Sequence, residues 1–256
     1  LPGSPIELQI SHRNTGKTPQ DPKPSLPSVL FFYDLGSGDS VQIDAGNYLS
    51  VRNPTISGEV GLGDDEGASF SGPTDPGSRA VIDRGLQTPA AISLDINDGD
   101  FVAVAHLTVT GGYDGLLVRN GSTSCSGTDL VLHGHVRDGA RIEAVAAGNV
   151  LGRLEAFDNQ RDGISITGPL ASLNESTVHG NGSAGIRLND VGNAVLEANN
   201  VFENLDGIVV ASTANGNTTV IGNPDLLTGR GNRVHDNASR GIVVGRNMLV
   251  VGNAVH

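Results

Sequence analysis

Short runs of alternating apolar and polar residues recur along the second half of the chain at a nearly fixed spacing. Each run follows a glycine, and an asparagine lies three or four residues before that glycine. The four units carry Asn159 with Gly163, Asn181 with Gly185, Asn204 with Gly207, and Asn237 with Gly241, so the glycines are 22, 22 and 34 residues apart. A period in this range predicts a solenoid, in which each repeat stacks on its neighbours.

The residues after each repeated glycine alternate with period two, which predicts a β-strand and not a helix. The apolar members of these strands are Ile164 and Ile166, Ile186 and Leu188, Ile208 and Val210, and Ile242 and Val244. A second apolar column is predicted at Leu151, Leu173, Leu196, Val220 and Val250. We therefore expect coils of short strands whose inward residues stack about 4.8 Å apart.

The recurring asparagine is predicted to lie at a turn. Asparagine tolerates a positive φ, and stacked side-chain amides can bond to each other along the solenoid axis. The glycine that follows suits a tight bend into the strand. Ligand binding is the alternative role for these asparagines, but a turn ladder is favoured because every coil needs one.

The N-terminal part of the chain differs from the repeats. Residues 1–24 are rich in proline and are predicted to be an arm or linker, with one alternating stretch at Ile6–Ile10. Residues 25–48 combine an amphipathic helix, for which Ser25 is the expected N-cap, with a strand and turn. A solenoid must cover its first coil, so this segment is predicted to be a cap. We expect one domain over residues 25–256, with regular coils over 102–256 and an incomplete last coil.

The sequence Gly-Asp-Ser-Val-Gln-Ile-Asp-Ala-Gly-Asn-Tyr at residues 38–48 resembles the N-terminal cap of the right-handed parallel β-helix proteins of the pectate-lyase-like superfamily. The coils that follow look like those of periplasmic copper-site accessory proteins, alginate epimerases and large bacterial surface proteins. Residues 70–76, 81–85 and 106–113 look most like modules of the surface proteins. The resemblance implies an all-β, right-handed parallel β-helix with a short capping helix.

Composition narrows the classes of function. The chain has 256 residues, 36 of them glycine, and a formal net charge of −12. Lysine occurs only at Lys17 and Lys23, so the basic surface that a nucleic-acid partner requires is missing. No apolar run approaches the roughly 20 residues of a membrane span, so we expect no membrane insertion. Acidity and the family resemblance favour an extracellular or cell-surface setting.

Stacking predicts one candidate site. Positions that flank the repeated glycines gather arginine and aspartate in the middle coils: Arg137, Asp138, Arg141, Arg161, Asp162 and Arg187. We expect these residues on one outer face, as a cationic strip for a carboxylated or sulfated glycan, because arginine binds such groups bidentately. Ion pairing along the ladder is the alternative. The 12 extra residues of the fourth unit are predicted near 224–231, where Asp225 and Arg230 would join the site.

Other reactive residues receive structural interpretations. His133, Phe157, His179, Phe202, His235 and His256 are predicted to form a half-buried stacking column, because histidines two coils apart are too distant to share a metal. Asp64–Glu66 and Asp95–Asp100 offer carboxylates to Ca²⁺, but turns are favoured for both. Cys125 lies in a polar stretch with no paired base nearby. We therefore expect no metal and no cofactor.

Two functions remain open at the level of sequence. The chain has neither the Asp-Pro-His of alginate epimerases nor the Asn-Thr-Asp and Gly-His-Gly of polygalacturonases. This favours a non-catalytic module with a structural, adhesive or glycan-binding role. The alternative is a lyase, epimerase or hydrolase that acts on an acidic polysaccharide along the outer face. The sequence also stops within a coil, so truncation, or end-to-end association of copies through an open C-terminal edge, is expected.

Overall fold

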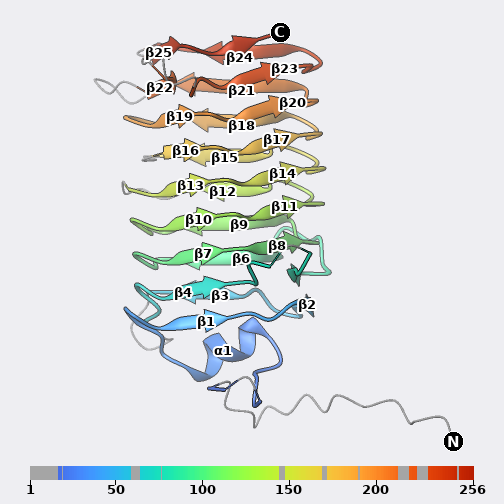
Figure 1. The fold of residues 1–256 in the computed structure, drawn as a ribbon, viewed down its shortest axis with the longest axis vertical. Coiled ribbons are helices and arrows are strands. Elements are labelled where there is room, and N and C mark those ends of the chain that lie inside the picture. The colour runs from blue at the N-terminus through green and yellow to red at the C-terminus, as the bar shows by residue number, and fades with distance from the viewer. Residues whose placement is uncertain are drawn as a thin grey trace, which may run out of the picture.

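Strands from successive coils pair in parallel and form three long sheets, which we call A, B and C. The computed structural model describes residues 17–18, 20–58, 64–75, 77–143, 148–168, 172–189, 191–212, 219–223, 230–246 and 248–256. Figure 1 shows the coils stacked in one column, with the single described helix, α1, against the N-terminal coil. This is the parallel β-helix that the period predicts.

Each coil contributes one strand to each sheet, in the order A, B, C, apart from the last coil, which contributes to A and B. Sheet A contains β1 (Ser40–Gln42), β4 (Ser69–Ser71), β7 (Ala103–Ala105), β10 (Ser126–Thr128), β13 (Val150–Gly152), β16 (Ser172–Asn174), β19 (Val195–Glu197), β22 (Thr219–Gly222) and β25 (Met248–Val251). Sheet B contains β2 (Gly46–Leu49), β5 (Ala80–Asp83), β8 (Leu107–Thr110), β11 (Val131–His133), β14 (Glu155–Phe157), β17 (Thr177–His179), β20 (Asn200–Phe202), β23 (Arg233–His235) and β26 (Ala254–Val255). Sheet C contains β3 (Thr55–Ser57), β6 (Ile92–Asn97), β9 (Asp114–Arg119), β12 (Ala140–Ile142), β15 (Ile164–Thr167), β18 (Ala184–Asn189), β21 (Asp206–Ser212) and β24 (Arg240–Val244).

The core is a set of apolar columns that run parallel to the axis. In sheet C, Ile164 and Ile166 align with Ile186 and Leu188 of the next coil, and all four are buried, as predicted. In sheet A the prediction fails at one position. Leu196 aligns with Ile221 and not with Val220, because the chain from β19 to β22 is longer than in the preceding coil.

The helix α1 (Leu26–Phe32) closes the N-terminal end of the core. Leu26 and Leu30, one turn apart, are buried and belong to the same apolar cluster as the coils. Ser25 holds the N-cap position, but its hydroxyl contacts the Ser28 hydroxyl at 3.1 Å and makes no capping bond to the backbone. The cap is thus held mainly by apolar burial.

Side-chain amides join the coils at the turn from sheet B to sheet C. Nδ2 of Asn181 donates to Oδ1 of Asn204 in the next coil at 2.9 Å and to the carbonyl of Ala156 in the previous coil at 3.0 Å. Oδ1 of Asn204 also accepts the backbone N–H of Asn181 at 3.1 Å. The same pattern links Asn159 to Asn181 and Asn204 to Asn237. The predicted asparagine ladder is therefore confirmed.

The prediction that each ladder asparagine has a positive φ was wrong. A positive φ occurs at the residue before it, at Asp158 (53°), Gly180 (64°), Glu203 (56°) and Asp236 (53°). The asparagine itself is selected because its amide can donate and accept along the axis, which bonds neighbouring coils.

The repeated glycine is selected for space and not for a bend. A Cβ placed on Gly185 would lie 2.5 Å from Cγ1 of Val201 and 2.8 Å from Nδ2 of Asn204. Gly163 and Gly207 show equivalent close approaches to the ladder asparagine of the following coil. Each glycine thus leaves room for the ladder asparagine of the following coil.

A second ladder, which the sequence analysis missed, joins the coils at the turn from sheet A to sheet B. Asn199 donates through Nδ2 to Oδ1 of Asn232 at 2.8 Å, and Asn232 donates to Oδ1 of Asn253 at 2.9 Å. Ser176 occupies the equivalent position one coil earlier, and its backbone N–H donates to Oδ1 of Asn199. The corner from sheet C to sheet A has such bonds too, since Asn149 donates to the carbonyl of Ser122 at 3.1 Å and accepts the backbone N–H of Cys125 at 2.9 Å. All three corners therefore have side-chain bonds along the axis.

We predict that Gly185→Ala lowers the free energy of unfolding by about 1–3 kcal/mol, the usual cost of overpacking a well-packed site. The added methyl group must displace Val201 or the amide of Asn204. Gly36→Ala is the matched control, because a Cβ there meets nothing within 4 Å. Urea titration followed by circular dichroism measures both variants, and equal stability of the two would contradict the steric role of the glycine column.

Candidate functional site

The candidate site starts from a column of aspartates at the entry to sheet C. Asp114, Asp138 and Asp162 lie one coil apart, one residue before the glycine column. Each carboxylate accepts a backbone N–H from the next coil: Asp138 Oδ1 from Asp162 at 3.2 Å, and Asp162 Oδ1 from Ala184 at 2.9 Å. The side chains of Asp138 and Asp162 are 0–1% exposed. The expectation that these two carboxylates lie on the outer face is therefore wrong.

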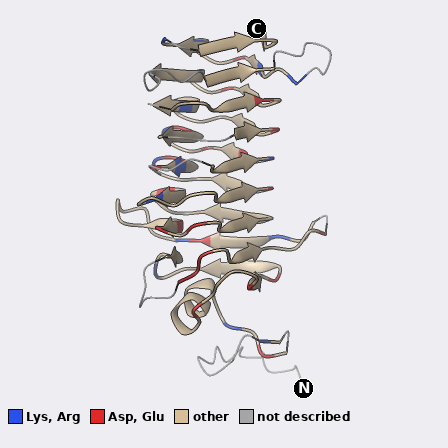
Figure 2. Cartoon of the chain, turned by 90° about the vertical axis from the view of Figure 1, so that its left-hand side faces the viewer, with Lys and Arg blue, Asp and Glu red and all other residues tan. Residues whose placement is uncertain are grey.

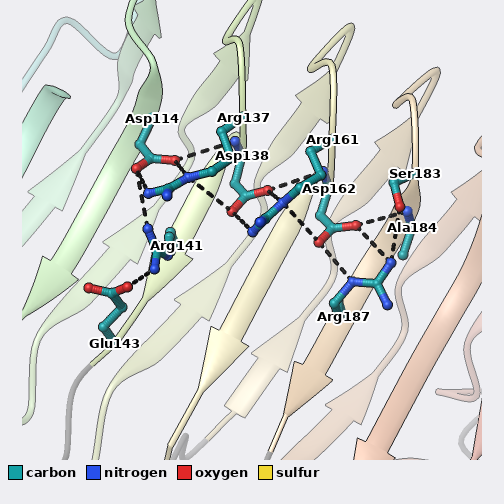
Figure 3. Close-up of polar contacts among 10 residues, drawn as sticks. All are labelled: Asp114, Arg137, Asp138, Arg141, Glu143, Arg161, Asp162, Ser183, Ala184 and Arg187. Carbon is teal, nitrogen blue, oxygen red and sulfur yellow. Dashed lines mark hydrogen bonds and ion pairs between the residues drawn. The ribbon is translucent and has the colours of Figure 1, made fainter. Parts of the chain in front are cut away.

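Three arginines cover these carboxylates. Arg137 lies on Asp114 with Nε–Oδ1 at 2.7 Å, Arg161 on Asp138 at 2.7 Å, and Arg187 on Asp162 with Nε–Oδ2 at 2.8 Å. Each guanidinium donates two bonds to its carboxylate, so the contacts are bidentate (Figure 3). We call Arg137, Arg141, Arg161 and Arg187 the arginine row. Each member binds an aspartate of the preceding coil, so the row also joins coils.

The arginine row is not a cationic strip. Arg141 contacts Asp114 at 3.7 Å and is also paired with Glu143. Four guanidinium groups therefore meet four carboxylates, counting Asp114 and Glu143, neither of which was among the predicted site residues. Figure 2 shows acidic and basic segments close together on the middle coils. The two partners were missed because their pairing depends on side-chain direction, which the repeat spacing does not give.

The outer sides of the arginines face solvent. The side chain of Arg161 is 46% exposed, and those of Arg137, Arg141 and Arg187 are 22–27% exposed. Arg137 also lies over the ring of Tyr113, 4.9 Å from its centroid, which fixes the guanidinium plane. The row therefore presents guanidinium groups whose inner side is bound and whose remaining N–H groups point outward.

Burial dominates the electrostatics below the row. Loss of solvent raises the pKa of Asp138 to about 6, although the bond from Arg161 acts in the opposite direction. A carboxylate that is buried and covered by arginine has no open path to a ligand. Asp138 and Asp162 can position Arg161 and Arg187, but they cannot contact a polymer on the surface.

Of the two site residues predicted in the insertion, Arg230 lies away from the arginine row and Asp225 falls outside the described residues. Arg230 pairs with Glu197 at 2.8 Å and with Glu175 at 3.3 Å, at the corner between sheets A and B. Arg230 is therefore not close to the arginine row, whose members lie at or just before the sheet C strands. Asp225 falls outside the described residues.

The histidines form two different environments. The rings of His133, Phe157, His179, Phe202 and His235 stack with centroids 4.9–5.2 Å apart, as the sequence predicts for these five. His135 instead is fully buried at the N-terminal end of the asparagine ladder. Its backbone N–H donates to Oδ1 of Asn159, and its Nε2 lies 3.1 Å from the carbonyl of Val109. Burial lowers the pKa of His135 to about 4.

Two acidic side chains and one thiol, which were expected in solvated turns or loops, are buried. Asp65 is 1% exposed and accepts the backbone N–H groups of Ser57 and Leu35, and burial raises its pKa to about 6. Cys125 is 2% exposed and donates to the carbonyl of Gly99, and burial raises the pKa of its thiol to about 11. Asp95 lies within β6, bound by Arg119 at 2.9 Å. Within the described ranges no three His, Cys, Asp or Glu side chains could hold one metal ion.

The family comparison agrees with this geometry. Residues 93–256, more than half of the chain, match the model of the family described as "Right handed beta helix region". The chain belongs to this family. Its fold is that of the right-handed parallel β-helices of the pectate-lyase-like superfamily. A comparison with curated protein sequences gives no match.

Solved β-helix structures show the same fold at low identity. The periplasmic alginate epimerase AlgG aligns with a TM-score of 0.58 and 14% identity over 86% of this chain and 61% of that chain. A double mutant of AlgG gives 0.56 and 14%, over 85% and 49%. An alginate lyase from Paenibacillus sp. str. FPU-7 gives 0.50 and 14%, over 90% and 92%. This β-helix thus spans between about half and three fifths of the AlgG chains.

We predict that His135→Asn makes this β-helix less sensitive to acid. The pKa of His135 is about 4 in the folded protein and about 6.5 in the unfolded chain. The stability that neutral His135 contributes is therefore fully present above about pH 6.5 and is lost as the pH falls toward 4. The contribution corresponds to about 3 kcal/mol. An asparagine here would repeat the bond that Asn159 Nδ2 makes to the carbonyl of Leu132.

Urea unfolding at pH 7 and pH 4.5 measures the effect in wild type, His135→Asn and His179→Asn. Asp114 and His133 are the charged or titratable groups that act on His135, and both are present in all three proteins. His179→Asn serves as the control, because it removes a half-buried histidine of the stacking column that does not act on His135. An equal loss of stability in wild type and His135→Asn would show that His135 is not the acid-sensitive group.

Proposed function

We propose that the chain is a rigid, non-catalytic module, outside the cell or at its surface, that binds an acidic polysaccharide lengthwise along the arginine row. The observation that carries the proposal is the arrangement of partly exposed guanidinium groups, each held by a buried carboxylate, on consecutive coils (Figure 3). A polymer laid along the axis would meet a similar group at each coil, and such repeated contacts reinforce one another.

The fixed guanidinium groups lower the cost of binding. A free arginine side chain loses rotamer freedom when it orders around a ligand, and this opposes association by about 0.5–1.5 kcal/mol per side chain. Arg137, Arg161 and Arg187 are already ordered by their aspartates. Their outward N–H groups can donate to a carboxylate or hydroxyl oxygen of a uronate without that loss.

The fold comparison supports a polysaccharide as the partner. AlgG is an alginate epimerase and the Paenibacillus protein is an alginate lyase, and both have this fold. Alginate is an acidic polymer, whose carboxylates match the chemistry of arginine. AlgG is periplasmic, which supports a place outside the cytoplasm, and the acidity of the chain favours the extracellular or surface setting that we propose. No described helix has the length and apolar character that a bilayer span requires.

The arrangement at the arginine row favours binding over catalysis. Arginine stays protonated and cannot act as a general base at neutral pH. The carboxylates Asp114, Asp138 and Asp162 are buried beneath the row, and His135 is buried and neutral. None of these groups reaches a polymer on the outer face.

End-to-end association of copies stays a prediction.

We predict that the double variant Arg161→Gln with Asp138→Asn weakens binding to alginate or polygalacturonate by at least about tenfold. Loss of one hydrogen bond to a charged group costs roughly 1.5–3 kcal/mol. Changing both partners avoids an unpaired buried charge, which would destabilise the fold. Isothermal titration calorimetry measures the affinity, with a neutral glucan as the ligand control.

The matched control is Arg230→Gln with Glu197→Gln, which removes a surface ion pair at another corner without changing the net charge. We expect it to bind as wild type does. Absence of binding by wild type, or equal weakening in the two double variants, would refute the proposal.

A separate assay tests the enzymatic alternative. We expect no ultraviolet absorbance of unsaturated product, and no epimerised product by NMR, when the protein is incubated with alginate or polygalacturonate. Turnover by wild type that Arg187→Ala abolishes would assign the arginine row to an active site and overturn the non-catalytic proposal.

A further inference from the structure

One connection between sheets A and B is longer than its neighbours. The chain from β4 to β5 contains residues 72–79, of which 72–75 and 77–79 are described, whereas β7 and β8 are separated by His106 alone. Asp129 and Leu130 make the same turn one coil later. Where the long connection meets these short turns, the structure contains a half-enclosed cavity of about 190 Å³. Three successive coils contribute to its walls.

The long connection carries two charged groups that coil stacking does not use. Asp75 and Arg79 are exposed and line the cavity. Their carboxylate and guanidinium make no hydrogen bond or ion pair with any other residue in the described ranges, although arginines of the row are bound to aspartates. Groups that stabilise no coil contact remain available to a ligand.

The other walls add polar and apolar surface. The carboxylate of Asp129 is bound on one side by Arg153 at 2.7 and 2.8 Å, and this bond lowers its pKa, so it stays an acceptor. Nε2 of His106 lies 4.0 Å from Asp129. Pro73 supplies a small apolar surface, whereas Leu107, which also borders the cavity, is only 1% exposed. Hydrogen-bonding groups and apolar surface therefore occur together in one small cavity.

We infer that this cavity binds one neutral, hydroxyl-rich sugar ring. The aspartates of the arginine row are buried, but the cavity exposes the carboxylates of Asp75 and Asp129 as well as the guanidinium group of Arg79, so it favours neither an anionic nor a cationic ligand. Carboxylates accept hydrogen bonds from hydroxyl groups, the guanidinium group donates them, imidazole can do either, and the apolar face of a sugar ring packs against Pro73. The volume is below the roughly 300–1,000 Å³ of drug-sized sites, which limits the ligand to about one ring.

The site is independent of the proposed polysaccharide face. It lies at the corner between sheets A and B, and the arginine row lies around the start of sheet C. A metal ion is a poor alternative, since within the described ranges the acidic and histidine side chains here do not form a three-ligand group. The cavity would give the module a second contact, to a sugar end or branch.

Saturation-transfer NMR on the full chain tests the inference with free glucose, galactose, mannose, N-acetylglucosamine and glucuronate as probes. We expect wild type to transfer saturation to at least one neutral sugar. Asp75→Ala with Arg79→Ala should weaken that binding by at least about tenfold, because it removes two charged hydrogen-bonding groups. Both positions are exposed, so the thermal unfolding midpoint should stay close to that of wild type.

Two further variants separate this site from other effects. Asp44→Ala with Arg52→Ala makes the same substitutions at exposed positions away from the cavity and should leave sugar binding unchanged. Arg161→Gln with Asp138→Asn should also leave it unchanged, whatever that variant does to polysaccharide binding. No transfer from wild type to any sugar, transfer to glucuronate alone, or unchanged binding by the Asp75 and Arg79 variant would overturn the inference.

Discussion

The asparagine ladder at the turn from sheet B to sheet C is the constraint on which the rest of the structure depends. In the middle of the ladder, at Asn181 and Asn204, the Oδ1 accepts two N–H groups from the preceding coil and the Nδ2 donates in both directions along the axis. A buried amide with unmet bonds is costly, so a coil can stack in one register only. The glycine column follows from the ladder, because a Cβ on Gly185 would collide with the amide of Asn204.

The charged residues also bond successive coils, and this limits the chemistry that they can perform. Buried aspartates such as Asp138 accept backbone N–H groups of the next coil, and arginines of the next coil cover them. Ion pairs of this kind orient side chains more than they stabilise the fold. The arginine row is thus an ordered surface with no net charge, whereas Asp75 and Arg79, on a connection outside the repeat, remain unbound within the described ranges.

The sequence predicted features that depend on period and missed features that depend on side-chain direction. The spacing of the repeated glycines predicted the coils, and the alternation at Ile186 and Leu188 predicted which residues face inward. Spacing also placed Asp138 beside the arginines, but it gave no sign that this carboxylate points inward. The added residues between β19 and β22 shifted the core position from Val220 to Ile221. An irregular connection breaks the period, so the cavity under it could not be predicted.

Native-state hydrogen exchange of the backbone N–H groups of Asn159 and Asn181 tests the central claim most directly. Both N–H groups donate to the amide oxygen of the next asparagine, and neither lies within a strand. If the ladder sets the stacking of coils, both exchange only through global unfolding, with the same opening free energy as the core strand amide of Ile186. Exchange at the rate of exposed turn amides would show that the coils are held without the ladder.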